Sequence, residues 1–384
     1  MNSGLFQVKS VKVNPNLILP TDGGISMNPM VRKFSLLALV AIIALGCTKR
    51  ESNSGNATER VPEYTFHKMK EGQEKPKVAY VTNAVASFWV IAESGVKQGG
   101  IDFNADVEVL MPAGGVVDQK QMIEDVLIKG VDGVAISPID PENQTDLINK
   151  AAQRANVIAH DSDAPDSNRL CYIGVDNYSA GLMCGQLARK HLPDGGKVAL
   201  FIGRLEQDNA KRRRQGTIDG LLGRDPDPTR FDPPGKEIEE AGYLVVGTFT
   251  DQFDKAQGKA NAEDVMSRHP DIAGMIGLFA DNPPLILEAL KQGDMLNKVK
   301  VIGFDEADET LQGIIDGTVA GTIVQNPYEY GRQSVRVLAG LARGETLADL
   351  GIPESLFVDI PARTIEKDNV EEFWAELKKN LGKE

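Results

Sequence analysis

Two stretches far apart in the chain share one pattern. Glu124-Asp-Val-Leu-Ile-Lys-Gly-Val-Asp-Gly-Val-Ala-Ile-Ser137 and Glu263-Asp-Val-Met-Ser-Arg-His-Pro-Asp-Ile-Ala-Gly-Met-Ile276 each predict a helix end, a turn and a short apolar strand. A polar loop follows each strand, at 137–143 and at 280–284. Strands that alternate with helices form βαβ units and parallel sheets. Because the pattern returns after about 140 residues, we predict two such sheets.

Other short apolar runs extend this pattern along the chain. We expect strands at 77–82, 107–110, 157–159, 197–202, 244–246 and 299–302, each followed by a polar loop. The predicted fold class is α/β, with two doubly wound parallel-sheet lobes. Ligands of open parallel sheets bind beyond the carboxyl ends of the strands. Two facing lobes would therefore place these loops on both sides of one cleft.

Composition narrows the functional classes. The chain has 384 residues, of which 41% are hydrophobic and 25% are charged, as in ordinary globular proteins. A formal net charge of -13 argues against a nucleic-acid partner. Three cysteines cannot form a disulfide framework, and four histidines leave little room for a multi-histidine metal site. We expect neither a metal nor a cofactor, and we interpret His160-Asp161-Ser-Asp163 as a strand end and loop.

The first 46 residues predict a targeting segment. Arg32 and Lys33 precede an apolar run at 34–45, which is too short to span a membrane and is typical of a secretory signal. The run ends in Ala44-Leu-Gly-Cys47, which resembles a bacterial lipobox and implies lipidation of Cys47. The alternative is an ordinary secretory signal. Residues 1–26 have no role in either signal, which makes Met27 or Met30 candidate starts.

Residues 47–76 are polar and lack apolar periodicity, so we predict a flexible tether between the lipid and the folded part. The expected location is periplasmic or otherwise extracytoplasmic, anchored to the bacterial membrane. We place the N-terminal lobe at 77–175 plus 326–353 and the C-terminal lobe at 176–325 plus 354–365. Residues 366–384 should form a helical tail on the body. Cys171 and Cys184 could pair in an oxidising compartment, but two buried free thiols are favoured.

An ordered series of short motifs carries a family resemblance. The series runs Ser-Phe88-Trp89, Ala159-His-Asp161, Asp176-Asn177, Ala210-Lys-Arg212-Arg-Arg214 with Gly216, Asp251-Gln-Phe253-Asp254, Ala280-Asp-Asn282, Gly303-Phe-Asp305 and Thr322-Ile-Val-Gln325. Over about residues 77–365 the chain resembles the ribose-binding-like, periplasmic sugar-binding proteins of ATP-driven (ABC) importers. The resemblance implies a monomeric binding protein that passes a monosaccharide or polyol to permease subunits. It implies no catalytic residue and no enzymatic activity.

Position by position, the resemblance implies a set of ligand-binding residues. They are Phe88, Trp89, Asp161, Arg212, Phe253, Asn282, Asp305, Gln325, Asn83 and Ser137. Carboxylates accept hydroxyl protons, Arg donates from a fixed fork, and amides do both, which suits a sugar. The aromatic rings could cover its C–H faces.

Each candidate also has a structural explanation. Phe88 and Trp89 could belong to the core, Asn282 could cap a helix before Pro283, and Gln325 could be a hinge residue. The chain departs from the ribose pattern at three places, namely Ala86-Ser87, Ser137 and Ser162, where ribose-type members carry Asn-Pro, Asn and Arg. These departures favour a sugar-type cleft over ribose itself.

Three other functions use the same elements differently. A receptor of this fold could present a sugar-like signal to a membrane sensor. A repressor would need a helix-turn-helix where this chain has the lipobox. A secreted enzyme would need a nucleophile motif or paired carboxylates, which we do not find in the sequence. We expect the two lobes to close about hinges near Asp176, Gln325 and Pro353.

Overall fold

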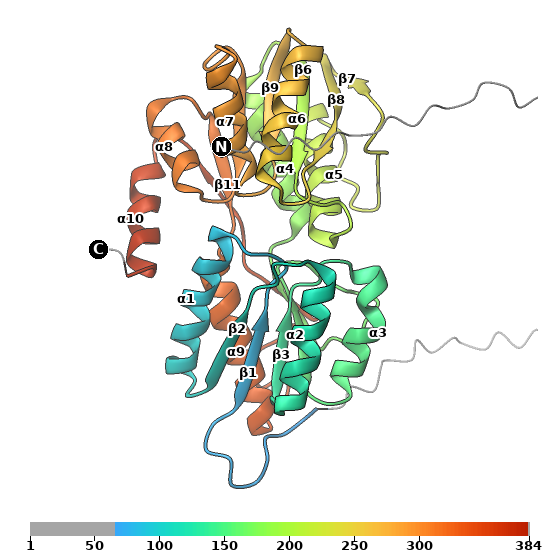
Figure 1. Cartoon of the computed structure of the whole chain (residues 1–384), viewed down its shortest axis with the longest axis vertical. Helices are drawn as coiled ribbons and strands as arrows, with labels where there is room; N and C mark the ends of the chain where they lie inside the picture. The colour runs from blue at the N-terminus through green and yellow to red at the C-terminus, as the bar shows by residue number, and fades with distance from the viewer. Residues whose placement is uncertain (1–65, 383–384) are drawn as a thin grey trace, which may run out of the picture. The chain divides into compact units, whose positions relative to one another are not determined.

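The computed structural model describes residues 66–382. The predicted signal, Cys47 and most of the predicted tether lie outside these residues. The described part contains two sheets flanked by helices, which confirms the predicted α/β class (Figure 1).

The first sheet has six strands in the order β12-β5-β4-β3-β1-β2, all of them parallel. Its strands are β1 (Lys77–Val81), β2 (Asp106–Leu110), β3 (Gly133–Ile136), β4 (Asn156–His160), β5 (Tyr172–Gly174) and β12 (Phe357–Asp359). Its helices are α1 (Ser87–Asp102), α2 (Val116–Lys129), α3 (Pro141–Ala152) and α9 (Pro327–Arg343). Along β1, Val78 and Tyr80 pack with α1 and α9, whereas Ala79 and Val81 pack with α2 and α3. Because successive side chains of a strand point to opposite faces, β1 contributes to two cores, one on each face of the sheet.

The second sheet has seven strands in the order β13-β11-β10-β9-β6-β8-β7. Its strands are β6 (Gly196–Ile202), β7 (Ile238–Glu240), β8 (Tyr243–Thr250), β9 (Ile272–Gly277), β10 (Lys300–Phe304), β11 (Gly321–Val324) and β13 (Arg363–Ile365). Its helices are α4 (Asn177–His191), α5 (Asp208–Leu222), α6 (Lys255–Arg268), α7 (Asn282–Gln292), α8 (Asp308–Asp316) and α10 (Val370–Asn380). Only the edge strands β7 and β13 run antiparallel. Along β6, Val198 and Leu200 pack on the side of α4 and α5, and Ala199 and Phe201 pack on the opposite side.

The chain passes between the two sheets at three places: from β5 to α4, from β11 to α9, and from β12 to β13. The first passage is held by Asp176, whose carboxylate accepts the N–H groups of Tyr178 and Ser179 at the start of α4. The third differs from the prediction, because β12 pairs with β5 in the first sheet. Residues 354–359 therefore belong with the first lobe, and the chain crosses at 360–362 and not near Pro353.

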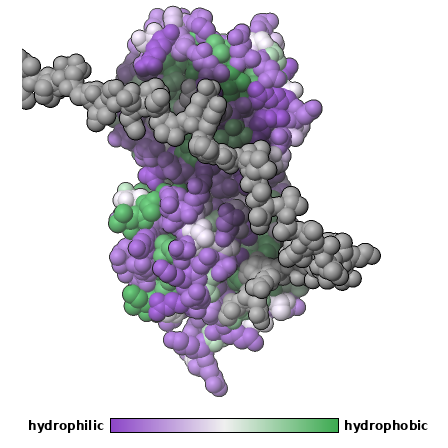
Figure 2. All heavy atoms as spheres, turned by 90° about the vertical axis from the view of Figure 1, so that its right-hand side faces the viewer, coloured by the Kyte–Doolittle hydropathy of each residue, from purple (hydrophilic) through white to green (hydrophobic). Residues whose placement is uncertain are grey.

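The C-terminal tail forms α10, whose Val370, Phe373 and Leu377 are buried in the second lobe. Cys171 and Cys184 are both free and buried. Where atoms of the described residues are visible in Figure 2, the face is mostly hydrophilic, with apolar side chains in small groups. No helix within residues 66–382 has the length and apolar composition needed to cross a membrane.

Helices α4 and α5 approach so closely that only glycine fits at the points of closest contact. A Cβ atom on Gly216 would lie 2.1 Å from the carbonyl oxygen of Tyr178, and one on Gly181 would lie 2.2 Å from that of Arg213. Both distances are far below van der Waals contact. This contact fixes α5 against the second sheet, and the first turn of α5 carries polar side chains of the site described below.

We predict that Gly216→Ala destabilises the fold by about 1–3 kcal/mol or more, because the helix backbones must separate to admit the methyl group. The control is Gly235→Ala, since a Cβ atom there meets nothing within 4 Å. Urea unfolding followed by circular dichroism measures both variants. Equal stability of the two variants would contradict the close packing of α4 and α5.

Candidate functional site

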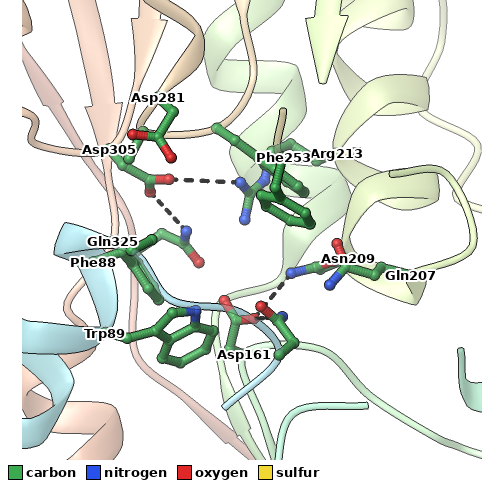
Figure 3. A pocket seen from close by; sticks show the side chains of 14 residues that line it. Phe88, Trp89, Asp161, Gln207, Asn209, Arg213, Phe253, Asp281, Asp305 and Gln325 are labelled. Carbon is green, nitrogen blue, oxygen red and sulfur yellow. Dashed lines mark hydrogen bonds and ion pairs between the residues drawn. The ribbon is translucent and has the colours of Figure 1, made fainter. Parts of the chain in front are cut away.

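A pocket lies where the carboxyl ends of strands from both sheets meet. From the first sheet, it is lined by Asn83, Ala86, Phe88 and Trp89 after β1, and by Asp161 after β4. From the second sheet, it is lined by Gln207, Asn209 and Arg213 after β6, Phe253 after β8, Phe279, Ala280 and Asp281 after β9, Asp305 after β10, and Gln325 after β11. The pocket is therefore built from the loops that the sequence pattern predicts on both sides of one cleft (Figure 3).

Asp161 and Asp305 occupy corresponding places in the two sheets. Each follows the last residue of its strand and has a left-handed backbone, with φ of 58° and 65°. The N–H of Asp161 donates to Ile173 at 3.1 Å, and the N–H of Asp305 donates to Ile323 at 2.7 Å. In each sheet, the neighbouring strand therefore holds the turn that directs a carboxylate into the pocket.

One oxygen of Asp161 accepts three hydrogen bonds. The donors to Oδ2 are Ser137 Oγ at 3.0 Å, Asn83 Nδ2 at 3.2 Å and Asn209 Nδ2 at 3.1 Å. The bond from Asn209 joins the two lobes across the pocket. Burial nevertheless raises the pKa of Asp161 to about 7, because it outweighs the lowering effects of the charge of Arg213 and of the hydrogen bonds from Ser137 and Asn209.

Asp305 lies beside the buried cation of the pocket, Arg213. Arg213 Nη1 is 3.9 Å from Asp305 Oδ2, and Gln325 Nε2 donates to Asp305 Oδ1 at 2.8 Å. Burial raises the pKa of Asp305, while Arg213 and Gln325 oppose that rise. The guanidinium also donates to the Leu278 carbonyl and to Asn177 Oδ1, and it lies 3.9 Å from the centroid of the Phe304 ring. Arg213 is therefore held rigidly in place.

Arg212 does not point into the pocket, contrary to the prediction. Its side chain is 44% exposed, and its Nε donates to Asp208 at 2.8 Å. Successive helix residues are rotated by about 100°, so the face that carries Asn209 also carries Arg213 four residues later. The third arginine of the run, Arg214, is buried elsewhere, where its Nε donates to Thr248 and its Nη1 to the Asp232 carbonyl.

Two aromatic pairs line the pocket from the two lobes. Phe88 and Trp89 meet edge to face, with ring centroids 4.8 Å apart. Phe253 and Phe279 are stacked, with centroids 5.7 Å apart. Phe88 and Trp89 also belong to the core of the first lobe, as the structural explanation predicts, and their contact with a ligand stays a prediction. Flat apolar faces beside convergent polar groups suit a ring that has hydroxyls and a C–H face.

Asn282 and Ser137 lie behind the lining. Asn282 Oδ1 accepts the N–H of Phe279, and its Nδ2 donates to Asp251 at 2.7 Å. Asn282 therefore fixes the loop before α7. It is the first residue of that helix and not its cap, so the predicted capping role is wrong, and Asp281 lines the pocket in its place. Ser137 supports Asp161 through a hydrogen bond.

The sequence prediction missed five lining residues with polar or aromatic side chains: Gln207, Asn209, Arg213, Phe279 and Asp281. All five lie in or just beyond loops that follow predicted strands. The spacing of Asn209 and Arg213, one helical turn apart, was the available sequence signal for a shared helix face. No cluster of His, Cys, Asp or Glu able to hold a metal ion occurs among residues 66–382.

Comparison with known proteins identifies the family. A family model described as a periplasmic binding protein domain matches residues 78–346. The D-ribose/D-allose-binding protein of Pseudomonas aeruginosa is 23% identical over 293 residues, which is 72% of this chain and 85% of that protein. The ribose import binding protein RbsB of Escherichia coli is 23% identical over 276 residues, which is 71% of this chain and 86% of that protein.

Solved structures show the same two-lobe fold. An ABC-transporter solute-binding protein from Burkholderia graminis, in complex with D-arabinose, has a TM-score of 0.69 at 28% identity, covering 78% of this chain and 98% of its own. GanP, a glucose-galactose binding protein from Geobacillus stearothermophilus, has a TM-score of 0.68 at 24% identity, covering 77% and 99%. Relatives and structures agree with the family model, and the chain belongs to the type 1 periplasmic sugar-binding proteins, a family of solute-binding proteins and not of enzymes.

Proposed function

We propose that this protein is the binding subunit of an ABC importer, and that it encloses one monosaccharide or related polyol and delivers it to the permease. The supporting observation is the pocket between the two lobes. There Asp161 and Asp305, from equivalent strand ends, lie with Arg213 and Gln325 among aromatic rings. The similarity to sugar-binding relatives supports the same proposal.

The polar groups of the pocket suit hydroxyls. Asp161 and Asp305 accept hydroxyl protons, Arg213 donates, and Gln325 can do both. A hydrogen bond to a charged group contributes roughly 1.5–3 kcal/mol net. The aromatic pairs provide apolar surface for the C–H face of the ring, and burial of that surface adds about 25 cal/mol per Å².

Domain closure is the proposed way to bury the ligand. The two lobes are joined by three chain passages, and Asn209 donates to Asp161 across the pocket at 3.1 Å. Hinge motion about such passages lets solvent and ligand enter when the lobes separate. Closure then excludes water, so that a missing ligand hydroxyl leaves a buried polar group unpaired.

The family works outside the cytoplasm, and we propose that this chain is held there by a lipid on Cys47. We predict that Cys47→Ser, expressed as the full precursor in a bacterial host, appears in the soluble extracytoplasmic fraction, because it lacks the acylated thiol. Fractionation and immunoblotting measure the distribution, with Cys171→Ser as the control that keeps Cys47. Membrane retention of Cys47→Ser would contradict the lipid anchor.

The sugar proposal predicts saturable binding of a neutral sugar by residues 48–384. Calorimetry and thermal shift with D-ribose, D-allose, D-arabinose, D-xylose, D-galactose and polyols measure it. A ligand at about 100 times its Kd should add roughly 2.7 kcal/mol of stability. We expect Arg213→Met to weaken binding by about 10–100-fold, because one charge-assisted donor is lost and Asp305 loses its cation.

Arg212→Met is the matched control, one residue away and outside the lining, and it should bind within about twofold of the wild type. Thermal unfolding of both variants separates loss of binding from loss of fold. If the folded wild-type protein binds none of these sugars or polyols, the sugar proposal is contradicted. A stronger effect of Arg212→Met than of Arg213→Met would contradict the assignment of the pocket arginine.

The raised pKa of Asp161 predicts a pH effect. Burial raises this pKa from 3.8 to about 7, so between these values the folded protein keeps a proton that the unfolded chain releases. A rise in pH through this window therefore lowers the free energy of unfolding, by up to about 1.4 kcal/mol per pH unit. Asp161→Asn lacks the effect, so its stability relative to the wild type should rise from pH 4 to pH 7.

His160 acts in the opposite direction, because burial lowers its pKa to about 3, so the folded protein releases a proton that the unfolded chain keeps. This contribution occurs in both proteins and cancels in their difference. Urea unfolding at several pH values measures that difference. A stability difference independent of pH would show that Asp161 titrates normally.

A further inference from the structure

The start of α5 leaves three buried amide atoms without a partner. Gln207 has no exposed surface and Asn209 is 3% exposed. Neither the Oε1 nor the Nε2 atom of Gln207 has a hydrogen-bond partner, and Asn209 Oδ1 has none. Both residues line the pocket, and Figure 3 shows them on the α5 side, with Asn209 directed toward Asp161.

The local structure does not account for these groups. Gln207 precedes the first residue of α5, but its side chain makes no capping hydrogen bond, and the preferred capping residues are Ser, Thr, Asp and Asn. Asn209 uses its Nδ2 on Asp161 and leaves its carbonyl oxygen free. Most buried polar side-chain atoms in proteins have a partner. A pocket that buries three without one is built for a ligand that supplies the partners.

The remaining charged and amide groups of the pocket differ in this respect. Asp161 accepts three protein donors, Arg213 donates to Asn177 and the Leu278 carbonyl, and Gln325 is paired with Asp305. These groups are held in place by the protein before any ligand binds. Gln207 and Asn209 are thus the side chains whose pairing depends most on which hydroxyls the ligand presents.

The amide atoms without a partner indicate which ligand group can bind here. Gln207 Nε2 offers two protons, and Gln207 Oε1 and Asn209 Oδ1 each accept one. Two neighbouring hydroxyls meet both needs, since each hydroxyl donates one proton and accepts another. A carboxylate or phosphate has no proton to donate and would approach Asp161 and Asp281 in the same lining.

We propose that Gln207 and Asn209 are the specificity-determining residues of this pocket and that they bind a neutral vicinal diol of the sugar. The inference rests on the proposed sugar-binding function. The side chains at the start of α5 would then discriminate among sugars, because an analogue that lacks one of the two hydroxyls leaves a buried amide atom unpaired.

The test is a comparison of sugars with their deoxy analogues in wild type and Gln207→Leu. The pairs are D-ribose with 2-deoxy-D-ribose, D-glucose with 2-deoxy-D-glucose, and D-galactose with 2-deoxy-D-galactose. For the sugar that binds best, we expect one deoxy analogue to bind the wild type at least about ten-fold more weakly. In Gln207→Leu and in Asn209→Leu, the ratio of the Kd of the deoxy analogue to the Kd of the sugar should fall below about threefold, because the amide that binds the hydroxyl is gone.

Gln312→Leu is the control, because Gln312 is an exposed residue of α8 that bonds only within its own helix, and it should keep the wild-type ratio. Gln207→Met keeps the side-chain length without the amide and repeats the comparison if Gln207→Leu does not fold. A deoxy ratio that is unchanged in both pocket variants would overturn the inference and leave the sugar-binding proposal intact. A wild type that binds no sugar would overturn both.

Discussion

Two carboxylates buried at the ends of equivalent strands determine what the rest of the site must do. Asp161 and Asp305 are 3% and 4% exposed, and burial raises the pKa of each. An isolated buried charge is costly, so each carboxylate needs partners that the protein holds rigidly. Asp305 has Arg213 and Gln325, both from elements of the second lobe. Asp161 has neutral donors, and one of them, Asn209, belongs to the opposite lobe.

Because Asn209 lies on α5 and donates to Asp161 in the other lobe, this helix couples the two lobes. Asn209 and Arg213 share a helix face, so the same helix donates to Asp161 and holds the cation beside Asp305. The position of α5 is itself fixed by its glycine contact with α4, where a Cβ atom would overlap the facing backbone. Packing in the second lobe therefore sets the geometry of polar contacts to the first.

The sequence predicts the parts of this architecture that depend on local pattern. Apolar runs followed by polar loops indicate the strands, and the ends of those strands indicate the pocket. The choice between Arg212 and Arg213 depends on helix phase, which a run of three arginines does not indicate by itself and which only the spacing from Asn209 to Arg213 suggests. Asn282 depends on Asp251, a tertiary partner 31 residues away that turns its amide from the pocket. Short edge strands such as β12 lack a pattern of their own and exist through pairing.

The aromatic side of the pocket is continuous with the folded core. Trp89 packs edge to face on His160, which stacks on Tyr80 inside the first lobe. Burial lowers the pKa of His160 to about 3 and keeps the ring neutral, so this stack carries no charge beside the Asp161 carboxyl. The apolar floor offered to a ligand is therefore the outer layer of the core, already ordered before binding. A preordered floor reduces the entropy that binding must overcome, and that leaves the polar side chains of α5 to distinguish one sugar from another.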